Sequence, residues 1–167
     1  MLVLVMGVAG SGKTTVASEL AQELGWDFLD ADSMHSPANV AKMQAGIALN
    51  DADRAPWLQT LRHEIEKAAA EKRNLVLACS ALRQTYRDQL TDGMDARVVY
   101  LKGSAEVLRE RLTRRTGHFV TQSLLESQLQ SLEEPGGALT VNVEHSVPEI
   151  IAEIRAEIRA HLGPSGE

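Results

Sequence analysis

A glycine-rich stretch directly after a short apolar run is the feature that most constrains the fold. The segment from Leu2 to Met6 is wholly apolar, and the sequence GVAGSGKT follows it at positions 7–14. This stretch matches the spacing G-x-x-x-x-G-K-[ST], in which glycines let backbone N–H groups turn inward around an anion. An unbroken apolar run is typical of a strand buried on both faces of a parallel sheet. The pattern therefore predicts a strand, a phosphate-binding loop and a helix, in that order.

The chemistry of this loop points to a nucleoside triphosphate. We expect the helix that begins near Lys13 to aim its positive end at phosphate oxygens, and Lys13 to reach the β- and γ-phosphates of ATP. The Thr14 hydroxyl is expected to bind Mg²⁺. A glycine-rich turn that binds no nucleotide is the alternative. The residues expected around the phosphates are Gly7, Ala9, Gly10, Ser11, Gly12, Lys13, Thr14 and Thr15.

Strand and helix patterns alternate along the rest of the chain. Apolar runs predict further strands at 26–29, 74–79, 97–101 and 139–143. Helical patterns separate them, up to Gly25 and near 38–46, 56–72, 83–90, 104–115, 121–133 and 147–162, with Pro56 in the first turn of its helix. Five strands separated by helices predict an α/β fold with a doubly wound parallel sheet. We expect one domain over residues 1–162 and a frayed tail at 163–167.

Composition excludes several other classes of protein. The 167 residues carry a net charge of −6 with no Lys/Arg-rich run at either end, which argues against binding nucleic acid or an anionic membrane over a broad surface. No apolar run approaches the ~18 residues of a membrane span, and the first residues lack the basic flank of a signal peptide. The single cysteine, Cys79, is expected to be a small buried side chain. These features predict a cytoplasmic protein.

Two carboxylates follow the second predicted strand. Asp30 and Asp32 come at the carboxyl end of that strand, which in a parallel sheet opens beside the phosphate loop. If the strand continues, residues at i and i+2 point the same way. One carboxylate would then hold Mg²⁺ while the other faces the hydroxyl of a phosphate acceptor. This arrangement favours a kinase, and a solvated acidic turn is the alternative.

Two polar segments complete the candidate site. A polar insertion at about 33–57 carries His35, Lys42 and Arg54, which suit an acidic polyol, although each alone could be a surface residue. Arginines crowd the end of a later helix, before Gly117-His118-Phe119. They predict a mobile lid at about 111–121 that excludes water and places guanidinium groups on the transferred phosphate. A solvated helix end is the alternative; the arginines are Arg109, Arg111, Arg114 and Arg115.

Several blocks, in this order, resemble the gluconokinase family, small P-loop kinases that phosphorylate D-gluconate with ATP and are related in fold to shikimate kinase. The loop at 7–14 is common to many nucleotide-binding proteins, whereas the later blocks are more specific. They are FLDADSMHSPANVAKMQAG at 28–46, LNDADRAPWL at 49–58, CSALRQTYRDQL at 79–90, YLKG at 100–103, GHF at 117–119 and LLESQLQSLEEP at 124–135. Departures are Ala48, where proline is common, and Arg83, where lysine is frequent.

The resemblance implies a role for particular residues. Lys13 and Thr14 would serve ATP and Mg²⁺, Asp30 would lie near the metal, and Asp32 would face the acceptor hydroxyl. A catalytic role falls to Lys13, Asp32 and Arg115, and a lid role to Arg111, Arg114 and Arg115. Seven residues would contact gluconate: Asp32, His35, Lys42, Arg54, Ser80, Arg87 and His118. The resemblance also implies a homodimer.

Two other functions stay open from the residues. A kinase of the same build could act on another small hydroxy acid, such as shikimate. A nucleotide-dependent switch or binding protein is the second alternative. Against the switch stand the paired Asp30 and Asp32, the arginine cluster, and Cys79-Ser80 in place of the carboxylate that such proteins carry after the third strand.

Overall fold

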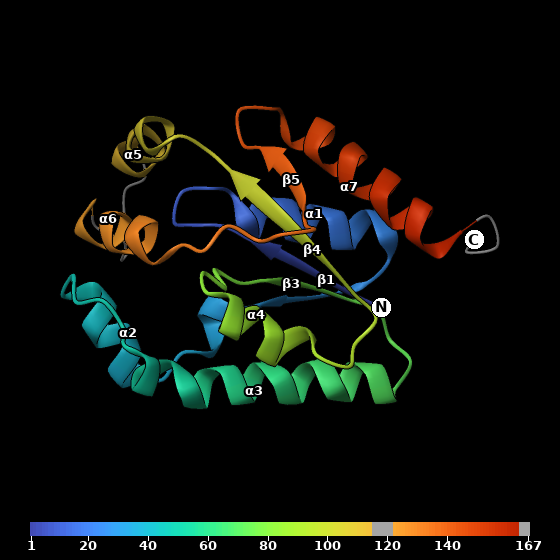
Figure 1. The fold of residues 1–167 in the computed structure, drawn as a ribbon, viewed down its shortest axis with the longest axis horizontal. Helices are drawn as coiled ribbons and strands as arrows, with labels where there is room; N and C mark the ends of the chain where they lie inside the picture. Colours follow the sequence, from blue (N-terminus) through green and yellow to red (C-terminus); the bar gives the residue numbers. More distant parts are fainter. Residues whose placement is uncertain (115–121, 164–167) are drawn as a thin grey trace.

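The computed structural model of this chain describes residues 1–114 and 122–163 and is built on a five-stranded sheet (Figure 1). Every pair of neighbouring strands is parallel, and the order is β2-β3-β1-β4-β5. The α/β fold with a doubly wound parallel sheet is therefore confirmed. The strands are β1 (Leu2–Met6), β2 (Asp27–Asp30), β3 (Leu75–Ala78), β4 (Ala96–Lys102) and β5 (Leu139–Asn142).

Helices cover both faces of this sheet (Figure 1). Side chains of β1 alternate between the two faces: Leu4 packs toward α3 and α4, and Val5 packs toward α1 and α7. No helix in the described ranges is long and apolar enough to cross a membrane. The helices are α1 (Lys13–Leu24), α2 (Pro37–Gln44), α3 (Asp51–Ala70), α4 (Gln84–Thr91), α5 (Ala105–Arg114), α6 (Gln122–Ser131), α7 (Val147–Leu162) and a short 3₁₀ helix, η1 (Ala31–Met34).

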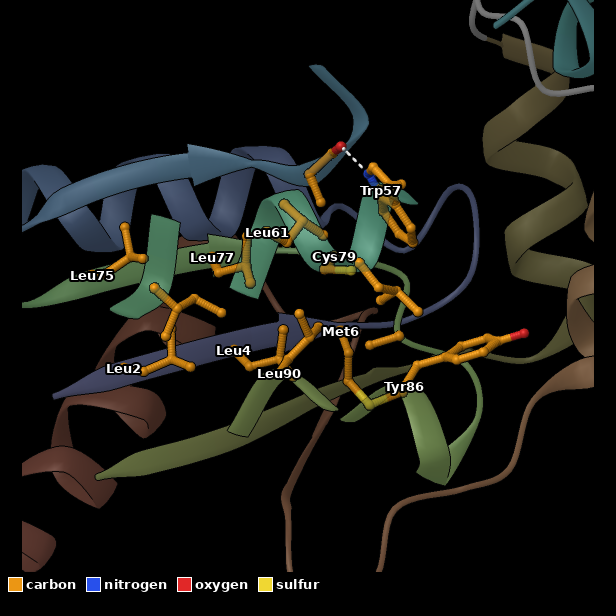
Figure 2. Close-up of a cluster of buried hydrophobic side chains, with 14 of the residues drawn as sticks. Leu2, Leu4, Met6, Trp57, Leu61, Leu75, Leu77, Cys79, Tyr86 and Leu90 are labelled. Carbon is orange, nitrogen blue, oxygen red and sulfur yellow. Dashed lines mark hydrogen bonds between the residues drawn. The ribbon is translucent and has the colours of Figure 1, made fainter. Parts of the chain in front are cut away.

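The core on the α3 side is continuous with the turn that follows β2 (Figure 2). Leu4, Leu61 and Leu77 are fully buried there. At the end of this cluster nearest the turn, the indole N–H of Trp57 donates to the carbonyl of Ala31 at 2.7 Å. The core packing of α3 thus also fixes the backbone that carries Asp32.

The start of α3 and the backbone after β2 show how local hydrogen bonds change the predicted pattern. Helix α3 begins at Asp51 rather than near Pro56, because Asn50 and Asp53 form a capping box that starts the helix earlier. The second strand ends at Asp30 and does not continue, because an Asp30 carboxylate oxygen accepts the Asp32 N–H at 3.0 Å and begins η1. The relative directions of the Asp30 and Asp32 side chains are therefore set by a helical turn and not by the alternation of a strand.

Gly103, directly after β4, leaves no room for a side chain. A Cβ there would lie 2.5 Å from Val143 Cγ2, which is buried beside the end of β5. We expect Gly103→Ala to lower the free energy of unfolding by about 1–3 kcal/mol, measured by denaturant titration. The matched variant is Gly136→Ala, whose Cβ would meet nothing within 4 Å. Equal stability of the two variants would contradict the packing described here.

Candidate functional site

The carboxyl ends of β1, β2 and β3 open on one cleft of about 560 Å³. Ligands of open parallel sheets bind at this edge, outside the ends of the strands. The cleft brings together most of the predicted site: Asp30, Asp32, His35, Arg54 and Ser80 line it, with Ala9, Gly10, Gly12, Lys13, Thr14 and Thr15 of the phosphate loop. Gly7 and Ser11, also predicted to surround phosphates, do not line this cleft.

The phosphate loop turns through two glycines in the left-handed region. Gly10 and Gly12 have φ of 81° and 90°, which residues with a Cβ rarely adopt. Gly12 is the N-cap of α1 and provides no side chain, so the first N–H groups of the helix are left for an anion. The Lys13 ammonium donates to the carbonyl of Val8 at 3.1 Å and so lies across the loop. The predicted anion cradle is therefore present in the backbone.

Thr14 and Asp30 form a pair of oxygen donors beside the loop. The Thr14 hydroxyl donates to Asp30 Oδ2 at 2.9 Å. Hydroxyl and carboxylate oxygens are hard ligands of the kind that Mg²⁺ prefers. Residues 1–114 and 122–163 contain no group of three His, Cys, Asp or Glu side chains that could hold a metal. The pair therefore fits an ion that takes its remaining ligands from phosphates and water.

His35 is held rigidly at the wall of the cleft. Its ring stacks on Trp57 with centroids 4.3 Å apart and planes 15° from parallel. Its Nδ1 lies 3.4 Å from the Asn39 amide nitrogen, which donates to the Asp53 carbonyl at 2.9 Å. Burial lowers the pKa of His35 below its ordinary value, with the Arg54 charge adding to the effect and Asp32 opposing it. The imidazole is therefore neutral at neutral pH.

Arg54 enters the cleft from the first turns of α3. Its guanidinium lies over the Tyr86 ring, 5.6 Å from the centroid, and Nη1 is 3.4 Å from the Tyr86 hydroxyl. That hydroxyl donates in turn to Asp51. Burial and the Asp51 carboxylate raise the pKa of Tyr86, so the phenol stays protonated. Tyr86 thus orients the cation, a role that we did not predict from the sequence.

Lys42 and Arg87 do not line the cleft. The Lys42 ammonium contacts both Asp53 carboxylate oxygens at 2.8 and 2.9 Å and ties α2 to α3, outside the lining of the cleft. The Arg87 side chain is buried and donates to the carbonyls of Ala81 and Leu82 at 2.8 and 3.1 Å. Its two terminal nitrogens thus hold the loop after β3, and a contact between Arg87 and the substrate stays a prediction.

Cys79, before that loop, is buried as predicted. Burial raises the pKa of its thiol to about 12, so the thiolate that a nucleophile requires does not form near neutral pH.

A second cavity, of about 360 Å³, lies beside the phosphate loop at the start of α1. Arg111 donates to the carbonyl of Val143 there. The two described lid arginines therefore lie at this cavity, while Arg115, His118 and the rest of the predicted lid at 115–121 fall outside the described residues. The cavity is lined by Ser11, Gly12, Thr15, Val16, Arg111, Arg114, Val143, His145, Val147 and Ile150. The apolar residues on either side of 142–146 were the sequence signal for its partly apolar wall.

Helix α6 supplies a wall of the cleft that sequence reasoning missed. Leu124, Ser127, Gln128 and Ser131 all line it. Their spacing of i, i+3, i+4 and i+7 places them on one face of the helix, and this pattern was the available signal. The Gln128 amide oxygen accepts the Ala9 N–H of the phosphate loop at 2.7 Å.

Comparison with known proteins agrees with this geometry. A family model described as an AAA domain matches residues 2–135. The gluconokinase of Gluconobacter oxydans is 49% identical over 134 residues, which cover 80% of this chain and 75% of that protein. A probable gluconokinase of Mus musculus is 44% identical and covers 92% of this chain and 95% of its own length.

A solved structure gives the same result in three dimensions. The crystal structure of a gluconokinase from Sinorhizobium meliloti 1021 superposes with a TM-score of 0.82 and 42% identity, covering 96% of this chain and 91% of that one. Residues 2–135 are thus an AAA domain, and the chain belongs to the gluconokinase family.

Proposed function

We propose that this protein transfers the γ-phosphoryl group of ATP to the 6-hydroxyl of D-gluconate, giving ADP and 6-phospho-D-gluconate. The observation that carries the proposal is that the phosphate loop opens on the same cleft as a carboxylate, Asp32, and a cation, Arg54. The names of the relatives reported above support gluconate as the acceptor. A related hydroxy acid such as shikimate is the alternative acceptor.

The phosphates of ATP bind along the N–H groups of the loop, with Lys13 toward the β- and γ-phosphates. The second cavity, with Val143, Val147 and Ile150 in its wall, takes the base. Thr14 and Asp30 would hold Mg²⁺, which when bound offsets the charge of the phosphates. Arg115 and His118 are proposed to act from the lid.

Gluconate lies between Asp32 and Arg54. The Arg54 guanidinium pairs with the carboxylate of the acid, since a planar guanidinium can donate twice to a carboxylate. Neutral His35 can exchange hydrogen bonds with a sugar hydroxyl. Asp32 orients the 6-hydroxyl and takes its proton as the oxygen bonds to the γ-phosphorus and the bond to ADP breaks.

The first test is ADP release by the purified protein with MgATP, alone and with D-gluconate, shikimate or other sugar acids at equal concentration. Stimulation by gluconate, with 6-phosphogluconate as product, is expected. Stimulation by another acid alone would move the proposal to that acceptor. Sedimentation of the same sample tests the predicted homodimer, and the cytoplasmic location likewise stays a prediction.

Loss of the groups that act on the transferred phosphoryl should reduce turnover. We expect Lys13→Met and Asp32→Asn each to lower kcat by about 10²-fold or more, because each removes charge stabilisation or proton transfer in the transition state. Circular dichroism should show an unchanged fold. The control is Asp92→Asn, which removes an exposed carboxylate that does not line the cleft. Near-normal kcat in either site variant would remove that residue from the mechanism.

Loss of the acceptor cation should act on gluconate and spare ATP. We expect Arg54→Ala to raise the KM for gluconate by about tenfold or more, because a charge-assisted hydrogen bond is worth about 1.5–3 kcal/mol. The KM for ATP should change by less than about threefold. A loss of about 1.4 kcal/mol would change it tenfold. Lys67→Ala removes an exposed cation of the same helix and serves as control. A larger effect on ATP than on gluconate would contradict the placement of the acceptor.

A further inference from the structure

The sequence block at 124–135 supports the family resemblance, and its polar residues have no role in the proposed mechanism. The α6 part of it is fixed in place by apolar packing. Leu125 is fully buried with Val8 of the phosphate loop and Leu108 of α5. One turn later, on the adjoining face of the helix, Gln128 lines the cleft. The helix therefore holds its polar row at a set distance from the phosphate loop.

The amide of Gln128 is oriented by its contact with the loop. Its Oε1 accepts the Ala9 N–H at 2.7 Å, a contact that joins residues 119 positions apart. An amide group is planar, so fixing the oxygen also fixes the direction of the two N–H donors on Nε2. Gln128 is half-buried and lines the cleft. Within residues 1–114 and 122–163 no hydrogen bond uses Nε2 as donor.

Four of the other polar side chains that line the cleft are charged. Lys13 and Arg54 attract anionic oxygens, and Asp30 and Asp32 accept protons or bind cations. A polyol also presents neutral hydroxyl oxygens, which are recognised by neutral donors in fixed positions. Ser127 and Ser131 flank Gln128 on the same face of α6 and add hydroxyl groups. The α6 face thus complements the part of the acceptor that the charged residues do not.

We propose that Gln128 is a specificity-determining residue, whose Nε2 donates a hydrogen bond to a hydroxyl oxygen of the phosphate acceptor. The inference rests on the proposed function, because it takes a hydroxylated acid as the acceptor. An acceptor without that hydroxyl leaves the oriented donor unpaired, so the amide selects for polyhydroxylated acids. The same side chain sets the distance between the acceptor and the phosphate loop through Ala9.

Three variants separate the donor from the loop contact. Gln128→Met removes both, Gln128→Glu keeps an oxygen for the Ala9 N–H but has no donor when ionised, and Gln130→Met changes an exposed glutamine of the same helix. The measurements are KM and kcat for gluconate, the Kd of MgATP without gluconate, and the melting temperature.

We expect Gln128→Met to raise the gluconate KM by about 10- to 100-fold, which corresponds to about 1.4–2.8 kcal/mol and lies within the cost of an unpaired polar group. Its Kd for MgATP should stay within about threefold of wild type, below the tenfold that 1.4 kcal/mol gives. Gln128→Glu should keep the wild-type melting temperature, because it keeps an oxygen for the Ala9 N–H, but its gluconate KM should stay raised. Gln130→Met should match the wild type throughout.

Recovery of the gluconate KM in Gln128→Glu would overturn the inference, because the loop contact alone would then explain the residue. An equal loss of MgATP affinity in Gln128→Met would overturn it as well, as would unchanged kinetics. Failure of the proposed function is seen separately: a wild-type enzyme that does not phosphorylate gluconate refutes both before any variant is compared.

Discussion

The turn from β1 into α1 is the constraint on which the rest of the site depends. Bound phosphates need several N–H groups aimed at one point, and only residues without a Cβ curl the backbone this way at low cost. Gly10 and Gly12 supply that curl. Because β1 is the central strand and is fully buried on both faces, the loop at its end cannot shift without disturbing the core. The phosphate position is therefore the fixed point of the molecule.

The acceptor side is built differently, from polar contacts between side chains. Asp53 caps α3 and also binds Lys42 of α2, so one carboxylate starts a helix and ties it to its neighbour. The Lys42 contact and the Asn50 N–H lower the pKa of Asp53, which keeps this carboxylate ionised at neutral pH. Trp57 links the same helix to the backbone beside Asp32. Groups that face the acceptor are thus oriented before any ligand arrives.

The parts predicted well from sequence are those that local rules determine. The buried strand, the glycines and Lys13 lie within one continuous segment, and the alternation of strands and helices fixes the sheet type. Arg87 shows the limit: a charged residue in a motif is as consistent with a buried structural role as with a ligand contact. Its structural role comes from the carbonyls that the folded chain places around it, some of them from distant positions such as Glu133. The α6 wall was missed for the same reason, since Gln128 meets Ala9 only after folding.

Arg87 also explains how two walls of the cleft keep their spacing. Its guanidinium joins the carbonyls of Ala81 and Leu82, after β3, to that of Glu133, just beyond α6. The Glu133 N–H donates back to Leu82 at 2.8 Å. Ala81 has a φ of 41°, a strained value for a residue with a Cβ, and these hydrogen bonds offset that cost. Since Ser80 and the α6 side chains line the same cleft, the buried Arg87 guanidinium, which lies outside that lining, fixes the spacing of two of its walls.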